Sequence, residues 1–137
     1  MAESLHITNR IDDLTLLDRF LRQATGSLAL SPVARMNLKL AVEEAVVNVM
    51  LYAYPGETDR DIVISVEHSE QEVCIVIADD GIAFDPTDRP APDISLPFDK
   101  RPVGGLGTFL MKKLMTKVSY RRTGNRNVLT MTKKYSE

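Results

Sequence analysis

The most constraining feature of this sequence is residues 32–54, a segment that is apolar on nearly every side when drawn as a helix. Ser31-Pro32 supplies an N-cap hydroxyl and a proline at the first helical position, and Pro55-Gly56 ends the segment. A helix that is hydrophobic all round does not suit a protein surface, so we expect this one to be deeply packed. The few polar residues in its middle part, LKLAVEEAVVNVMLYA, therefore stand out.

Two shorter segments precede this helix. Residues 4–8 alternate in polarity and predict a short edge strand. Apolar residues recur at helical spacing over 11–25, which predicts an amphipathic helix with Asn9 or Asp12 as its N-cap and Gly26 at its end.

The second half of the chain is predicted to contain two β-hairpins, a loop and a helix. The hairpins pair residues 61–67 with 72–79 and residues 118–123 with 127–134. Five prolines and no apolar period make residues 82–103 an irregular loop, and a loop of this length is often a binding loop or lid. The segment LGTFLMKKLMTKV, residues 106–118, has helical spacing.

The element order β-α-α-β-β-loop-α-β-β predicts an α+β fold. We expect a two-layer α/β sandwich with helices stacked on one face of a mainly antiparallel, mixed sheet. A chain of 137 residues is long enough for one domain with a real core, so residues 1–137 are interpreted as a single domain.

Charge is unevenly distributed along the chain. The formal net charge is −2, but residues 1–99 carry a net −11 and residues 100–137 a net +9. Either the two parts neutralise each other within one fold, or the basic end helps to hold an anion. The small overall charge does not indicate a nucleic-acid or membrane partner.

Cysteine usage and hydropathy favour a cytoplasmic protein. Cys74 is the only cysteine, which excludes an internal disulfide, and its apolar surroundings in VCIVIA predict a buried structural thiol. The N-terminal residues lack the pattern of a signal peptide, and no stretch approaches the ~18 apolar residues of a membrane span.

The buried helix carries two polar side chains that lie on one face. Glu44 and Asn48 are four residues apart, whereas Glu43 is about 100° further round and is expected to reach solvent. A buried carboxylate without a partner is costly. Glu44 is therefore either a functional group or the partner of a lysine or a backbone group.

A second polar group lies at the end of the predicted strand 72–79. In IADDGIAF, Asp79 and Asp80 stand at the end of the strand, and Gly81 permits a sharp exit of the backbone. A carboxylate in this place can accept hydrogen bonds from an exocyclic amine. An ordinary Asp-Gly turn is the alternative interpretation.

The third feature is the glycine run GGLGTFL, residues 104–110, directly ahead of a predicted helix. Free N–H groups at a helix N-terminus bind anions, and glycines let phosphate oxygens approach them closely. A glycine-rich hinge without a ligand would have the same sequence.

Taken in order, EEAVVN, DDG and GGLG resemble the N, G1 and G2 boxes of the GHKL (Bergerat-fold) ATPases. The phrase GGLGTFLMKKLM and the ending VLTMTKKY look most similar to bacterial anti-sigma-factor serine/threonine kinases of the RsbW type. The resemblance extends over about residues 8–134.

This resemblance implies roles for the residues of each box. Asn48 would coordinate Mg²⁺ and Glu44 would act as general base toward a serine or threonine hydroxyl. Asp79, with Gly81 two residues later, would bind the adenine amine of ATP. The phosphates would be cradled by Gly104, Gly105, Leu106, Gly107 and Thr108, with residues 82–103 as the ATP lid.

Three positions depart from the family pattern. Ala83 replaces a second glycine, Tyr52 stands where a histidine is common, and Val128 occupies the place of a hydroxyl residue near adenine. Thr130 and Thr132 lie nearby in the sequence.

The resemblance implies a kinase that phosphorylates an anti-sigma-factor antagonist, a STAS-type protein, and binds a sigma factor in the alternative complex, as a homodimer. The alternative is a binding module that sequesters a regulator without catalysis. We rank the catalytic part of a histidine kinase lower, since no dimerisation helix precedes the domain and His6 and His68 are expected in a terminal strand and a turn.

Overall fold

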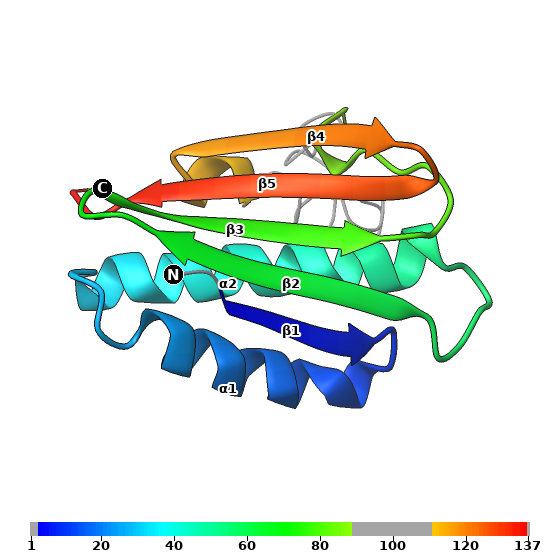
Figure 1. The fold of residues 1–137 in the computed structure, drawn as a ribbon, viewed down its shortest axis with the longest axis horizontal. Coiled ribbons are helices and arrows are strands. Elements are labelled where there is room, and N and C mark those ends of the chain that lie inside the picture. The colour runs from blue at the N-terminus through cyan, green and yellow to red at the C-terminus, as the bar shows by residue number, and fades with distance from the viewer. Residues whose placement is uncertain (1–2, 89–110, 137) are drawn as a thin grey trace, which may run out of the picture.

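The computed structural model describes residues 3–88 and 111–136, which form a sheet covered on one face by helices (Figure 1). The strands are β1 (Glu3–Thr8), β2 (Asp61–His68), β3 (Glu72–Asp79), β4 (Lys117–Thr123) and β5 (Arg126–Lys134). Their order is β1-β2-β3-β5-β4, and each pairing among the described strands is antiparallel. The predicted α+β sandwich is confirmed, and its described sheet has no parallel pairing.

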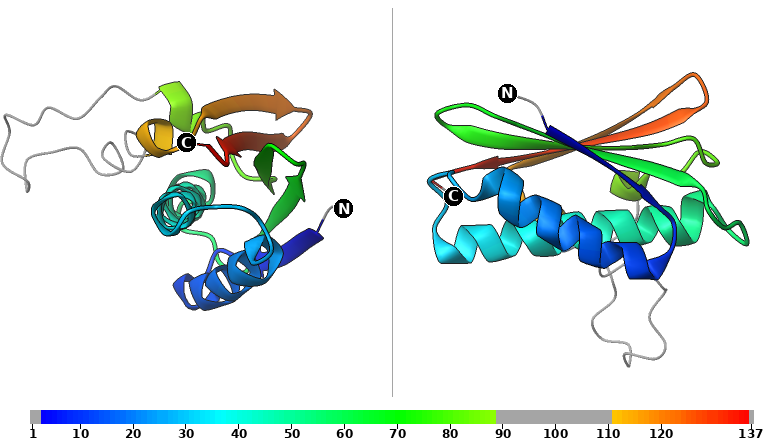
Figure 2. Two further views of the ribbon diagram at one scale, coloured as in Figure 1. Left: turned by 90° about the vertical axis from the view of Figure 1, so that its left-hand side faces the viewer. Right: turned by 60° about the horizontal axis from the view of Figure 1, so that its bottom comes forward.

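Two long helices form the second layer. The helix α1 (Leu14–Thr25) follows a short 3-10 turn, η1 (Ile11–Asp13), and α2 (Pro32–Asn48) continues into a π turn, η2 (Val49–Ala53). Both helices lie on the same side of the sheet (Figure 2). Residues 111–114 are also helical, and η3 (Pro86–Asp88) is a second 3-10 turn. No helix in the described ranges has the length and apolar character to cross a bilayer.

The centre of α2 is as deeply packed as its sequence predicts. Its fully buried apolar residues meet the inward-facing side chains of the strands, which alternate along each strand as a half-covered sheet requires. The most buried of these residues include Leu38, Ala41, Val42, Val46, Ile62, Ile64, Ile75, Ile77 and Met131.

The caps of the two long helices differ from each other. The Ser31 hydroxyl accepts the Ala34 N–H at 3.0 Å, so the predicted N-cap of α2 is confirmed. The prediction of Asn9 or Asp12 as a cap is wrong, because α1 begins after Asp13 and has no side-chain cap bond. Asn9 is used elsewhere: its side chain accepts the Arg60 N–H at 3.0 Å and thereby joins β1 to the loop before β2.

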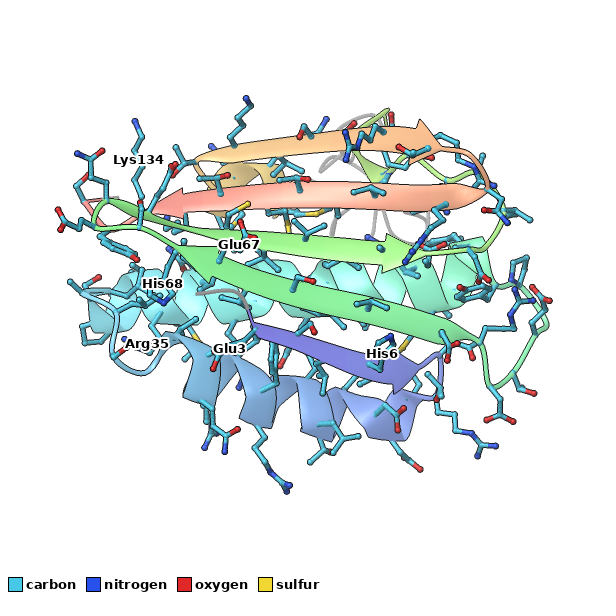
Figure 3. The ribbon with its side chains drawn as sticks, viewed as in Figure 1. Glu3, His6, Arg35, Glu67, His68 and Lys134 are labelled. Atoms are coloured by element: carbon cyan, nitrogen blue, oxygen red, sulfur yellow. The ribbon has the colours of Figure 1, made fainter. Side chains whose placement is uncertain are left out.

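The other face of the sheet has no covering layer in the described part of the chain. His6 and Glu67 project from it toward the viewer (Figure 3). Cys74 also alternates onto this face and is only half-buried, so the prediction of a buried thiol is wrong. The neighbouring Val73 and Ile75 take the inward positions, and partial burial raises the pKa of the Cys74 thiol.

Candidate functional site

Asn48 is the last residue of α2 and has a polar side chain that the fold does not satisfy. The residue is 3% exposed, and its buried Nδ2 finds no hydrogen-bond partner among the described residues. A buried polar group left unpaired costs about 1–3 kcal/mol. Such an atom marks a place where a bound group or water would supply the missing partner.

Glu44 lies one turn before Asn48 and is half-buried. Lys39, on the same helix, pairs with Asp18 at 3.0 Å and stands 4.0 Å from the Glu43 carboxylate. Glu43, a third exposed, thus has a cation beside it, whereas Glu44 has no ion pair or side-chain hydrogen bond within residues 3–88 and 111–136. The alternative in which Glu44 pairs with a lysine is not seen among the described residues.

Beyond Asn48 the helix widens into the π turn η2, where a continuous α-helix to Tyr54 was predicted. A single apolar run has nearly the same pattern in both geometries, so the sequence could not distinguish them. A π turn within an α-helix is frequent at functional sites. Here the carbonyl oxygen of Ala53, at the end of the turn, accepts the N–H of Ile82 at 2.9 Å.

The contact with Ala53 explains the glycine that follows the two aspartates. A Cβ atom at Gly81 would lie 2.3 Å from the carbonyl oxygen of Ala53. The glycine therefore permits two backbones to approach, and it is not needed for a left-handed φ, which the backbone has only at Asp59, Gly56 and Gly124 among the described residues. The end of β3 is thus fixed against η2, about five residues beyond Asn48.

Asp79 is held inside this junction. It is 2% exposed, and its Oδ1 accepts the Gly81 N–H at 2.9 Å and the Asn127 amide at 2.8 Å. Burial raises the pKa of the Asp79 carboxyl, while the two hydrogen bonds act in the opposite direction. Its Oδ2 accepts no hydrogen bond from the described residues and is left for a donor from outside.

Asp80 has a different environment. The Tyr54 hydroxyl lies 2.6 Å from its Oδ1, and Arg60 donates to the same oxygen at 3.1 Å. The hydrogen bond from Tyr54 lowers the pKa of Asp80, and Arg60 adds to this effect. Burial and the bond to Asp80 raise the pKa of Tyr54. Asp80 therefore ties the strand end to the C-terminal end of η2 and pairs with a cation on the protein surface, whereas Asp79 is the buried carboxylate of the two.

Tyr52, at the position where the family commonly has histidine, stacks on Phe84 with 5.2 Å between ring centroids. This contact holds the first residues after β3 against the turn that follows Asn48. Further along, the ammonium group of Lys112 donates to the Thr87 carbonyl oxygen. The helical residues 111–114 and η3 are therefore in contact.

The sequence analysis did not identify Asn127. Asn127 is directly opposite Asp79 in the β3–β5 register and is 4% exposed. Val128, Thr130 and Thr132 alternate onto the uncovered face, whereas Asn127 faces the helices. Strand alternation from the core residue Leu129 would have assigned Asn127 to the inner face.

The glycine run and most of the predicted lid lie outside the described residues. This applies to Gly104, Gly105, Leu106, Gly107 and Thr108, and to residues 89–103. A cavity of about 300 Å³ lies between α1 and α2, and none of the predicted site residues line it. The described residues contain no cluster of His, Cys, Asp and Glu that could hold a metal ion.

Comparison with known proteins agrees with this geometry. Residues 7–133 match the family model of the histidine kinase-like ATPase domain. The chain belongs to this family. The fold of this histidine kinase-like ATPase domain also resembles that of histidine kinase AdeS from Acinetobacter baumannii, with a TM-score of 0.52 over 98% of this chain and 68% of that chain. At 14% identity, this likeness shows the shared fold alone.

The curated relatives of this histidine kinase-like ATPase domain are named as protein kinases. It is 34% identical over 98 residues to serine/threonine-protein kinase BtrW of Bordetella bronchiseptica, covering 72% of this chain and 69% of that protein. Serine-protein kinase RsbW of Listeria monocytogenes is 31% identical, with 68% of each chain covered. RsbW of Bacillus subtilis is 34% identical, with 60% and 54% covered. The predicted resemblance is confirmed, and the relatives indicate a kinase that uses ATP.

Proposed function

We propose that this histidine kinase-like ATPase domain is a serine/threonine protein kinase that uses Mg²⁺ and ATP. The observation that carries the proposal is a pair of polar groups one turn apart on α2, the Glu44 carboxylate and the Nδ2 of the buried Asn48 amide, neither of which has a partner among the described residues. Asp79, with a free carboxylate oxygen, is fixed to the continuation of the same helix. The names of BtrW and RsbW support the choice of serine and threonine as acceptors.

Each group has a role that suits its chemistry. Asp79 Oδ2 would accept a hydrogen bond from the exocyclic amine of adenine. Glu44 would take the proton of a serine or threonine hydroxyl as that oxygen attacks the γ-phosphorus of ATP. The phosphates would bind the glycine run, through Gly104, Gly105, Leu106, Gly107 and Thr108.

The Asn48 side chain fits Mg²⁺. A neutral amide oxygen is a suitable ligand for an ion that keeps several waters and takes its other ligands from phosphates. The unpaired Nδ2 beside it would then bond to a phosphate oxygen or to a water of the ion. Mg²⁺ would supply positive charge to the transferring phosphoryl group.

We further propose that the acceptor is an anti-sigma-factor antagonist of the STAS type and that the same chain binds a sigma factor in the alternative complex, as a cytoplasmic homodimer. Support comes from the RsbW-like motifs and from the RsbW relatives. Exchange between two partners would follow from their different affinities for the nucleotide states of the kinase.

The decisive experiment compares Glu44→Gln with Glu43→Gln in transfer of labelled γ-phosphate to an antagonist encoded near the kinase gene. Both substitutions remove one carboxylate from adjacent positions of α2, but of the two only Glu43 has a cation beside it among the described residues. Loss of a general base lowers transfer by about 10²–10⁴-fold. We expect this loss in Glu44→Gln with ATP affinity retained, and transfer within about twofold of wild type in Glu43→Gln.

Three results would contradict the proposal. Equal transfer rates for Glu44→Gln and wild type would remove Glu44 from its role. Tight ATP binding without transfer to any hydroxyl would favour the sequestering module. The absence of a thermal shift with Mg·ATP would count against the site itself, because ligand at 100 times Kd stabilises by about 2.7 kcal/mol.

A further inference from the structure

Asn127 makes more contacts than a buried strand residue requires. Its Nδ2 donates to Asp79 Oδ1 and to the Ile82 carbonyl oxygen, each at 2.8 Å. Its Oδ1 accepts from the Phe84 N–H at 3.2 Å, the Tyr120 hydroxyl at 2.5 Å and the Arg122 guanidinium at 3.1 Å. Every polar atom of the side chain is therefore in use.

These partners fix which way the amide points. A guanidinium and a backbone N–H are donors only, so the atom that faces Arg122 and Phe84 must be the amide oxygen. The amide NH₂ is thereby directed at Asp79 and Ile82, which offer only acceptors. Rotation of the amide by 180° would place donor against donor on one side and acceptor against acceptor on the other.

The fixed amide determines which Asp79 oxygen is available. Asn127 and Gly81 both donate to Oδ1, which holds the carboxylate in one rotamer and leaves Oδ2 without a partner in the described structure. Without Asn127, Asp79 would keep only the local bond to Gly81, two residues away. The carboxylate would then be free to turn its oxygens.

Asn127 also holds the backbone that leaves the site. Ile82 and Phe84, its two backbone partners, lie in the segment after β3, and Phe84 is stacked on Tyr52. Arg122 reinforces the arrangement by donating to the Gly81 carbonyl oxygen at 2.8 Å. The Asp79 carboxylate and the backbone after β3 are thus oriented by the Asn127 amide on the neighbouring strand β5.

We propose that Asn127 is a positioning residue that orients Asp79 and thereby sets the preference of the site for a purine with a 6-amino group over one with a 6-oxo group. This inference rests on the proposed nucleotide-binding function. A 6-amino group donates to the fixed carboxylate oxygen, whereas a 6-oxo group sets its own lone pairs against it. A carboxylate that can turn away no longer makes this distinction.

The test measures affinities for ATP and inosine triphosphate by calorimetry; the two differ in the 6-substituent and in the proton that inosine carries at N1. Asn127→Leu removes the amide at similar volume, and Asn125→Leu makes the same change at an exposed turn position of the β4–β5 hairpin. We expect wild type and Asn125→Leu to prefer ATP. We expect Asn127→Leu to bind ATP about 10- to 100-fold more weakly, with its inosine triphosphate affinity within about threefold of wild type.

A purely structural role would weaken both nucleotides alike, so the ratio of affinities separates orientation from damage to the fold. If Asn127→Leu does not fold, Arg122→Gln can be measured instead, because Arg122 is exposed and donates to the Asn127 amide oxygen. Its loss should shift the ratio of the ATP and inosine triphosphate affinities by a smaller factor. A wild-type ratio in both variants, or no preference in wild type, would overturn the inference. Failure of wild type to bind any nucleotide would instead refute the proposed function on which it rests.

Discussion

Replacement of Gly81 by alanine should destabilise the protein through one steric contact with known atoms. The new Cβ would lie 2.3 Å from the Ala53 carbonyl oxygen and 2.8 Å from the Ala53 carbonyl carbon, where an ordinary contact is at least 3.4 Å. The two backbones would have to separate by roughly 1 Å. That movement would break the Ile82 N–H bond to the same Ala53 oxygen, now 2.9 Å long.

The expected cost has two parts. Overpacking a buried contact costs about 1–3 kcal/mol, and loss of a net hydrogen bond adds about 0.5–1.5 kcal/mol. We therefore expect Gly81→Ala to lower the free energy of unfolding by about 2–4 kcal/mol, which is about 10 °C in Tm for a domain of this size. Because Gly81 also donates to Asp79, ATP affinity should fall at least about tenfold.

Gly124→Ala provides the matched control. Gly124 has a φ of 61°, and no atom of the described residues lies within 4 Å of the added Cβ, so alanine there meets backbone strain without a clash. That strain costs about 1–2 kcal/mol and should leave ATP binding intact. Urea unfolding and thermal melts would measure both variants. A Gly81→Ala protein within 1 kcal/mol of wild type and with unchanged ATP affinity would refute the reasoning.

Three further predictions concern individual side chains. Ser31→Ala removes the N-cap bond of α2 and should lower the free energy of unfolding by about 1 kcal/mol in urea; an unchanged value would contradict this. Lys133→Met keeps the buried aliphatic part of the side chain but removes the hydrogen bond that Nζ donates to the Leu114 carbonyl oxygen at 2.7 Å. The free energy of unfolding should fall by about 1–3 kcal/mol. An unchanged value would show that water replaces the bond. Asp79→Asn should abolish ATP binding without destabilising the protein at neutral pH. Burial raises the pKa of Asp79 in the folded protein above its ordinary 3.8, so between the unfolded-state and folded-state pKa values the folded state binds more protons than the unfolded state. The free energy of unfolding of wild type should therefore fall relative to that of Asp79→Asn as the pH rises through the folded-state pKa. Parallel stability curves for the two proteins would contradict this.

Much of the site was predictable because its residues are adjacent in sequence to strong local signals. Glu44 and Asn48 share a helix whose start at Ser31 and apolar character are explicit, and four-residue spacing aligns them on any helix. Asp79 is the last residue of a strand whose alternation of buried and half-buried positions is regular throughout. The family resemblance supplied the roles of these residues, which spacing alone left open between functional and structural interpretations.

The sequence by itself determined the two layers, the element order and the positions of Glu44, Asn48 and Asp79, because periodicity and caps depend only on neighbouring residues. Tertiary structure decided the rest: the π turn after Asn48, the reason for a glycine at 81 and the bond between Asn127 and Asp79. Each of these depends on a group more than 25 residues away that approaches within 3 Å. Contacts of that kind are fixed by how strands and helices pack, and no local pattern records them.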